Sequence, residues 1–93
     1  MIRSFQDSET EKIYERKKSK KLPHEIQQVA LRKLRMLDNA TNLNDLRVPS
    51  ANRLEKLSGD LAGRYSIRIN DQWRILFEWR NGDAYGVRIT DYH

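Results

Sequence analysis

The strongest clue to the fold lies in residues 64–93. Within residues 73–80 a large apolar side chain occupies every second position, mostly separated by charged side chains. A period of two is the pattern of a strand with one face in a core. Arg74 falls on the opposite face of this strand, and we expect it to point into solvent. The predicted apolar face consists of Trp73, Ile75, Phe77 and Trp79.

Two similar runs flank this strand. Residues 65–69 and 85–90 alternate in the same way. Residues 70–72 are turn formers, and residues 81–83 begin with Asn-Gly, which strongly favours a tight hairpin. A shorter run at residues 54–57 is a candidate for a further strand. The carboxyl-terminal half is therefore predicted to be a four-stranded antiparallel meander.

The amino-terminal part is predicted to be mainly helical, after a short edge strand at residues 2–5. Residues 8–11, Ser-Glu-Thr-Glu, fit a capping box at the start of a helix that runs to about Ser19. Pro23 suits the first position of a second helix. The second helix has one apolar stripe, formed by Ile26, Val29, Ala30, Leu34 and Leu37.

At 93 residues the chain is predicted to form one α+β domain, residues 1–93, in which two amino-terminal helices pack on one face of a small antiparallel sheet. It has no cysteine and only two histidines, so we expect neither a metal nor a cofactor. No apolar run approaches the roughly 20 residues that span a bilayer, and the amino terminus shows no apolar signal-peptide core. We therefore expect a cytoplasmic protein without membrane contact.

The net charge of +5 suggests an anionic partner. Residues 1–36 hold ten Lys or Arg against five Asp or Glu, whereas residues 37–93 hold eight of each. Five cations lie within residues 16–21. Such a run is typical of a solvated helix end, and the alternative interpretation is that it contacts RNA phosphates. Seven of the eight later cations are arginine, whose planar fork suits phosphate oxygens, although pairing with carboxylates across the sheet is the alternative.

Four segments carry a family resemblance. They are residues 52–60 (NRLEKLSGD), 65–75 (YSIRINDQWRI), 81–85 (NGDAY) and 91–93 (DYH). In these segments the chain resembles the HigB-type toxins of the RelE/ParE superfamily, and the resemblance covers essentially the whole chain. It implies a type II toxin that cleaves mRNA in the ribosomal A site and is silenced by a HigA-type antitoxin with a helix-turn-helix domain. Operator DNA would then be contacted only through the antitoxin.

The resemblance also implies the site residues. Arg74 matches a phosphate-contacting arginine, and Asp91, Tyr92 and His93 match terminal residues on which activity depends. RNA scission needs a base for the ribose 2′-hydroxyl, a group that stabilises charge on the phosphoryl oxygens, and an acid for the leaving 5′-oxygen. We assign the acid to His93, because its adjacent terminal carboxylate favours imidazolium. The residues expected to bind RNA are Arg53, Lys56, Arg64, Arg68, Lys17, Lys18, Lys20 and Lys21.

The neighbours of His93 have expected roles of their own. Asp91 orients the imidazole or holds a nearby arginine, and Tyr92 offers a ring for base stacking and a hydroxyl as a second proton carrier. This mechanism requires one geometry. The imidazole of His93 must lie within reach of the Arg74 guanidinium, with both open to a phosphodiester.

The chain departs from the family pattern close to the expected site. Glu55 and Ser58 stand where some members have a histidine and a lysine. Either the general base comes from another group, with Glu55 and Lys56 as candidates, or cleavage is weak.

Two other functions fit the same residues. A toxin of this fold can act by binding a protein target such as DNA gyrase, which the terminal histidine and the Trp-Arg strand argue against. The chain can also be a non-catalytic RNA-binding module that uses residues 16–21 and the sheet arginines. In such a module, replacement of His93 by alanine would leave activity intact.

Overall fold

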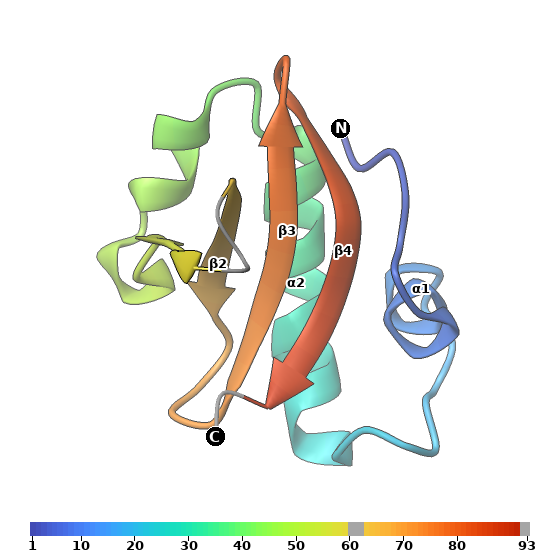
Figure 1. Ribbon diagram of the computed structural model, residues 1–93. Helices are drawn as coiled ribbons and strands as arrows, with labels where there is room; N and C mark the ends of the chain where they lie inside the picture. Colours follow the sequence, from blue (N-terminus) through green and yellow to red (C-terminus); the bar gives the residue numbers. More distant parts are fainter. Residues whose placement is uncertain (60–62, 92–93) are drawn as a thin grey trace.

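The computed structural model describes residues 1–59 and 63–91. Over these ranges the chain forms two α-helices, α1 (Ser8–Tyr14) and α2 (His24–Asn39), and two 3₁₀ helices, η1 (Leu43–Arg47) and η2 (Ser50–Asn52). The strands are β1 (Glu55–Lys56), β2 (Arg64–Arg68), β3 (Trp73–Arg80) and β4 (Asp83–Asp91). They form an antiparallel sheet in the order β1-β2-β3-β4, with α2 lying across one face (Figure 1). The predicted α+β class and strand meander are confirmed.

Short turns connect β2 to β3 and β3 to β4. In the first turn, Oδ1 of Asn70 accepts hydrogen bonds from the backbone N–H groups of Gln72 (2.9 Å) and Trp73 (2.8 Å). In the second turn, Asn81 and Gly82 have φ angles of 51° and 82°. A two-residue hairpin loop of this kind requires positive φ at both positions. Both turns lie where the sequence predicts them.

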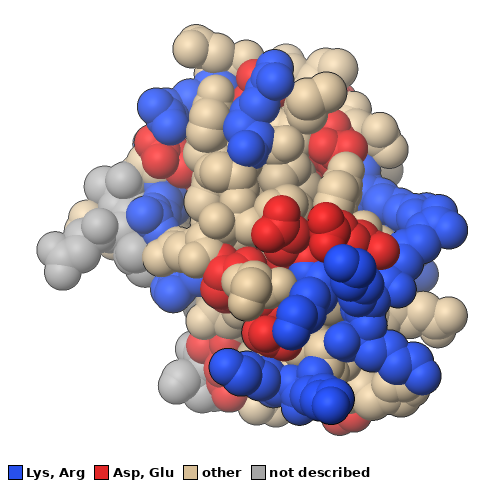
Figure 2. Space-filling model, turned by 90° about the vertical axis from the view of Figure 1, so that its right-hand side faces the viewer, with Lys and Arg blue, Asp and Glu red and all other residues tan. Residues whose placement is uncertain are grey.

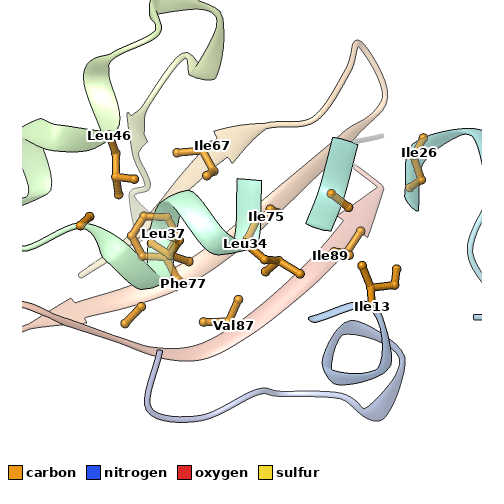
Figure 3. Close-up of a cluster of buried hydrophobic side chains, with 13 residues drawn as sticks. Ile13, Ile26, Leu34, Leu37, Leu46, Ile67, Ile75, Phe77, Val87 and Ile89 are labelled. Atoms are coloured by element: carbon orange, nitrogen blue, oxygen red, sulfur yellow. The ribbon is translucent and has the colours of Figure 1, made fainter. Parts of the chain in front are cut away.

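The apolar core lies between α2 and the sheet. Leu34 and Leu37 of α2 and Ile75 and Phe77 of β3 are fully buried, and Figure 3 shows these side chains gathered together. Ile13 of α1 joins the same cluster. Four residues of the predicted apolar stripe of the second helix, Ile26, Ala30, Leu34 and Leu37, are therefore core, as their spacing predicts, whereas Val29 is only half-buried and lies outside the cluster.

The two tryptophans of β3 lie less deeply than predicted. Trp73 and Trp79 are half-buried and pack against the cluster from its margin. Trp73 is the first residue of the strand and Trp79 the last but one. Only the middle of the alternating face is therefore fully enclosed.

The amino-terminal segment pairs with β4 at two points. Ile2 and Phe5 form isolated parallel bridges with Ala84 and Val87, respectively. The predicted edge strand is thus reduced to two bridges. They connect the chain before α1 to β4, and α1 lies beside that strand (Figure 1).

The cap of α1 is Asp7, so the predicted Ser8 cap is wrong. Oδ1 of Asp7 accepts a hydrogen bond from the backbone N–H of Thr10 at 2.7 Å. Aspartate and serine are comparably good caps, and the aspartate one position earlier satisfies the free amide.

Both helices have boundaries that differ from prediction. Helix α1 ends at Tyr14 rather than near Ser19, and Arg16 has a positive φ of 65°. Helix α2 begins at His24, with Pro23 as its N-cap instead of its first residue. Neither helix of the described chain combines the length and hydrophobicity needed to cross a bilayer.

Replacing Leu34 with alanine is expected to lower the free energy of unfolding by about 2–5 kcal/mol, because the side chain is fully buried and leaves a cavity. Urea denaturation followed by circular dichroism measures this change. Val48→Ala is the control, since Val48 is 73% exposed and should change the free energy by less than about 0.5 kcal/mol. Equal effects of the two substitutions would contradict this description of the core.

Candidate functional site

The face of the sheet turned away from α2 carries a group of arginines. Side chains alternate along a strand, and directly paired residues share a face. The strand register therefore places one set of side chains together, toward the viewer in Figure 1. We call this set the open sheet face. It includes Arg64, Ser66, Arg68, Arg74, Leu76, Glu78, Arg88 and Thr90.

Arg74 lies on the open sheet face but is only 5% exposed. The prediction that it points into solvent is therefore wrong, and a phosphodiester that contacts its guanidinium must displace groups that now cover it. Its Nε donates a hydrogen bond to the Ser66 hydroxyl (2.8 Å), and its Nη2 donates to the backbone carbonyls of Arg53 (2.6 Å) and Ser66 (3.4 Å). The loop that precedes β1 supplies the Arg53 carbonyl. The guanidinium is thus held between β2 and this loop.

Glu55 is an acidic partner of Arg74. Nη1 of Arg74 lies 3.8 Å from Oε1 of Glu55, and the two side chains are 6% and 45% exposed, respectively. The pairing of β1 with β2 places Glu55 opposite Ser66, on the face of Arg74, and Lys56 opposite Tyr65. The carboxylate is therefore held beside a buried cation while remaining accessible to a ligand.

Arg88 is a site candidate that our sequence reasoning missed. It lies opposite Leu76 in the sheet, and its Nε is buried with no hydrogen-bond partner among residues 1–59 and 63–91. A buried donor without a partner costs about 1–3 kcal/mol, so an anion that accepted its hydrogen bond would remove this penalty. The available signal was the period of two, since Arg88 alternates with the buried Val87 and Ile89.

Two predicted RNA-binding arginines, Arg64 and Arg68, lie on the open sheet face together with Arg74 and Arg88. Nη1 of Arg64 donates to the side chain of Gln6 at 3.4 Å, and Arg68 forms an ion pair with Asp71. The Asp71 side chain is 97% exposed, so solvent screens that pair. Both arginines can therefore exchange these partners for an anion. The nearby exposed residues of the RNA-binding prediction are Arg53 and Lys56.

The carboxyl-terminal site residues are described only as far as Asp91. Oδ2 of Asp91 accepts a hydrogen bond from Nε2 of Gln72 at 2.8 Å, and the residue lies opposite Trp73. Tyr92 and His93 lie outside the described residues. The predicted approach of the His93 imidazole to Arg74 lies outside them as well.

The basic run at residues 16–21 begins as the end of α1 and continues as a turn fixed by hydrogen bonds. The backbone N–H groups of Arg16 and Lys17 donate to the carbonyls of Ile13 (3.0 Å) and Lys12 (2.8 Å), which closes the helix. The Ser19 hydroxyl donates to Oε1 of Glu9 (2.7 Å) and accepts from the backbone N–H groups of Lys21 (3.1 Å) and Leu22 (3.2 Å). The Gln27 side chain donates to the Ser19 carbonyl (2.9 Å) and accepts from its N–H (3.2 Å). The Ser19 hydrogen bond also lowers the pKa of the Glu9 carboxyl. The cations of this turn therefore project from a defined backbone.

This turn forms a basic surface apart from the open sheet face. Figure 2 shows Lys and Arg gathered in the lower part of the side that carries α1. A pocket of about 700 Å³ lies there between α1 and α2, with Ile13 and Leu31 among its apolar lining. His24, the first residue of α2, is exposed at its edge. The cations that line the pocket are Arg16, Lys17, Lys18 and Arg35. Two predicted RNA-binding residues, Lys20 and Lys21, are exposed in the same turn.

The open sheet face offers groups suited to phosphodiester chemistry. Glu55 can accept a proton, Arg74 beside it can stabilise negative charge, and Arg88 has a buried donor nitrogen to satisfy. Within the described part of the chain, no group of three or more His, Asp or Glu side chains is placed to hold a metal ion.

Comparisons with known proteins agree with this chemistry. Residues 3–93 match the HigB-like toxin model, described as RelE-like toxin of type II toxin-antitoxin system HigB. The chain is 44% identical to Toxin HigB-1 of Vibrio cholerae serotype O1 over 93 residues, which cover 99% of this chain and 98% of that protein. It is 32% identical over 93 residues to Endoribonuclease HigB of Proteus vulgaris, with 100% of both chains covered.

Solved structures share the fold. YafQ from E. coli strain BL21(DE3) superposes with a TM-score of 0.67 at 14% identity, covering 99% of this chain and 92% of that one. The YoeB-YefM complex from Staphylococcus aureus contains a chain that superposes with a TM-score of 0.58 at 18% identity, covering 100% and 98%. At such identities the likeness concerns the fold alone.

Proposed function

The chain belongs to the HigB-like family of RelE-like toxins of type II toxin-antitoxin systems, and on that basis we propose that it is an endoribonuclease that cleaves mRNA in the A site of the ribosome. The observation that carries the proposal is the pair formed by Glu55 and the buried Arg74 on the open sheet face. The name of the Proteus relative, Endoribonuclease HigB, supports the same reaction class. Cleavage of mRNA during translation would inhibit protein synthesis and growth.

The reaction begins when Glu55 accepts the proton of a ribose 2′-hydroxyl. The 2′-oxygen attacks the adjacent phosphorus, and negative charge grows on the phosphoryl oxygens, where Arg74 and Arg88 stabilise it. The bond from phosphorus to the 5′-oxygen then breaks, and His93 supplies the proton that this oxygen takes up. The products are a 2′,3′-cyclic phosphate end and a 5′-hydroxyl end. Each proton-transfer role typically contributes about 10²- to 10⁴-fold to the rate.

The geometry supports Glu55 rather than Lys56 as the base. Glu55 lies 3.8 Å from the Arg74 guanidinium, which is the group that would bind the phosphate. Lys56 is the next residue of the strand and pairs opposite Tyr65, so its side chain leaves the sheet on the other face. A base must lie within hydrogen-bond reach of the hydroxyl next to the bound phosphate.

The roles of Tyr92 and His93 rest on the sequence. Thr90 lies opposite Arg74 in the register, and His93 follows Thr90 by three residues. Three extended residues span at most about 10 Å, a length that would let the imidazole reach a phosphate bound beside Arg74 if the chain turned back toward the open sheet face. Tyr92 would stack on an unpaired base, a contact worth about 1–3 kcal/mol. Asp91, held by Gln72, gives these two residues a defined starting point.

The toxin has an antitoxin partner, as a member of a type II system. We propose that this partner is a HigA-type protein with a helix-turn-helix domain, that operator DNA is contacted only through it, and that both proteins act in the cytoplasm. We expect the gene beside this one to encode a small helix-turn-helix protein, and co-expression with that protein should restore growth and allow the two proteins to purify together. Growth arrest that persists in the presence of that protein would contradict this assignment.

The lysines of the basic turn are proposed to contact ribosomal RNA. Replacing Lys17, Lys18, Lys20 and Lys21 together with glutamine should weaken binding to ribosomes and reduce the slope of log K against log salt by about 0.7–0.9 for each phosphate that is no longer bound. Filter binding at several salt concentrations measures the slope. Lys12→Gln is the control, because Lys12 lies on an exposed part of α1. It should change the slope by no more than about 0.9, the value for one phosphate. A slope that is unchanged in the fourfold variant would remove these lysines from the interface.

A translating extract tests the function as a whole. Purified toxin is added, and the ends of the mRNA are mapped together with the integrity of plasmid DNA. The proposal predicts new mRNA ends at codon positions within translated regions and intact DNA. DNA breaks that depend on gyrase, with intact mRNA, would instead show that the toxin acts on a protein target. Binding to ribosomes without new ends would show a non-catalytic module.

A further inference from the structure

Lys33 of α2 is buried, with 4% of its surface exposed. Its Nζ donates a hydrogen bond to Oδ1 of Asn52, which is fully buried. Burial lowers the pKa of the Lys33 ammonium, and the positive charges of Arg32 and Arg68 lower it further. Burying a cation against a neutral amide disfavours the folded state. Lys33 should therefore have a role other than stabilising the fold. Its hydrogen-bond partner Asn52 indicates which part of the structure that role concerns.

Asn52 connects Lys33 to the loop that precedes β1. It is the last residue of η2, and its Nδ2 donates to the backbone carbonyl of Leu46 at 3.1 Å. The next residue, Arg53, has a left-handed conformation with φ 44° and ψ 57°, which residues with a side chain rarely adopt. The carbonyl of Arg53 accepts the hydrogen bond from Nη2 of Arg74 at 2.6 Å. An unbroken series of contacts thus runs from α2 to the open sheet face.

We propose that Lys33 is a positioning residue for the nuclease site, which sets the orientation of Arg74 through Asn52 and the Arg53 carbonyl. The same loop continues into Glu55, so both members of the proposed catalytic pair depend on it. This inference rests on the proposed nuclease function. It assigns the activity of the open sheet face partly to a lysine on the helix that covers the other face.

Lys33→Met is the test substitution, because methionine matches the length of the lysine stem but cannot donate to Asn52. The expected result is a maximal rate of mRNA cleavage on ribosomes that falls about 10- to 100-fold, the scale of a small misplacement of a reacting group. The toxin concentration that gives half the maximal rate should stay within about twofold of wild type, because Lys33 contacts no substrate and K33M leaves the exposed cations in place. An unchanged maximal rate would overturn the proposal.

A double-mutant cycle separates positioning from general damage. If Lys33 acts through Arg74, then Lys33→Met should slow cleavage in the wild-type background but add less than about twofold in the Arg74→Ala background. Leu34→Ala is the matched control, because it is the next residue of α2 and contacts the core. It should destabilise the protein more than Lys33→Met does and yet retain the wild-type rate at a temperature where both are folded. Additive effects of Lys33→Met and Arg74→Ala would contradict the proposal.

A readout independent of activity distinguishes this inference from the proposed function. The ¹H–¹⁵N signal of Arg74 Nε, assigned by its loss in Arg74→Lys, should shift in Lys33→Met and stay in place in Leu34→Ala. One outcome is that the signal shifts in Lys33→Met although neither the wild-type protein nor any variant cleaves mRNA. This outcome would support the contacts from Lys33 to Arg74 and contradict the proposed nuclease function. If Arg74→Ala abolishes cleavage while Lys33→Met leaves both the signal and the rate unchanged, the inference fails alone.

The pH dependence of stability gives a further check. The folded state holds the Lys33 proton less tightly than the unfolded state, so below the folded pKa the charged lysine disfavours folding. As the pH rises toward about 10.4, the unfolded value, this effect disappears. The thermal midpoint of Lys33→Met minus that of wild type should therefore be most positive near neutral pH and shrink in alkaline buffer. A difference that is constant with pH would show that Lys33 is not held as a buried ammonium.

Discussion

Replacing Arg74 with alanine is expected to lower the rate of mRNA cleavage about 10²- to 10³-fold, the effect typical of removing one well-placed donor to a developing anion. Two further changes act in the same direction. The Arg53 carbonyl and the Ser66 hydroxyl lose their donor, and Glu55 loses a cationic neighbour. Single-turnover cleavage of mRNA on purified ribosomes measures the rate.

Arg80→Ala is the matched control for the Arg74 substitution. Arg80 lies on the same strand, but its side chain is 57% exposed and pairs with Glu78 at 3.1 Å. Its removal should change the cleavage rate by less than about threefold, since an exposed pair contributes little. Arg74→Lys keeps the charge but cannot bond to β2 and the loop at once, so it should recover only part of the rate. Equal rates for Arg74→Ala and Arg80→Ala would exclude Arg74 from the site.

Replacing Glu55 with glutamine is expected to slow cleavage about 10²- to 10⁴-fold, because an amide cannot accept the proton of the 2′-hydroxyl. The size of the side chain is retained, and the exposed position should keep the change in stability within about 0.5 kcal/mol. Ribosome binding should persist. Single-turnover rates and a binding assay on the same preparation check both expectations.

Glu78→Gln serves as the control for Glu55, since Glu78 pairs with the exposed Arg80 rather than with Arg74. It should leave the rate unchanged. A normal rate in Glu55→Gln combined with a slow rate in Lys56→Gln would transfer the role of base to Lys56. Normal rates in both would place the base outside β1.

The pattern of the strands was predictable because it depends on neighbours in sequence. The period of two in residues 73–80 located β3, and the Asn-Gly turn at Asn81 located the hairpin to β4. The apolar spacing of α2 predicted which of its faces meets the sheet. Such signals depend only on residues that are close in sequence. They were sufficient for the core because regular helices and strands form it.

The surroundings of the site were not predictable by the same means. Alternation places Arg74 on the face away from the core, but it does not reveal that the loop at Arg53 folds over it. These residues are far apart in sequence, and the contact between them depends on the whole fold. Lys33 was missed for the same reason, because a lysine within a helix is usually at the surface. Its partner, Asn52, belongs to the short 3₁₀ helix η2, which no regular apolar spacing in the sequence marks.

The chemistry of the cleaved ends tests the nuclease mechanism most directly. Purified ribosomes that carry a defined mRNA are mixed with the toxin, and the new ends are identified by mass spectrometry. We expect a 2′,3′-cyclic phosphate on the upstream fragment and a 5′-hydroxyl on the downstream fragment, with both products lost in Glu55→Gln. Intact mRNA with wild-type toxin, or equal amounts of product with Glu55→Gln, would contradict the assignment of catalysis to the pair of Glu55 and Arg74.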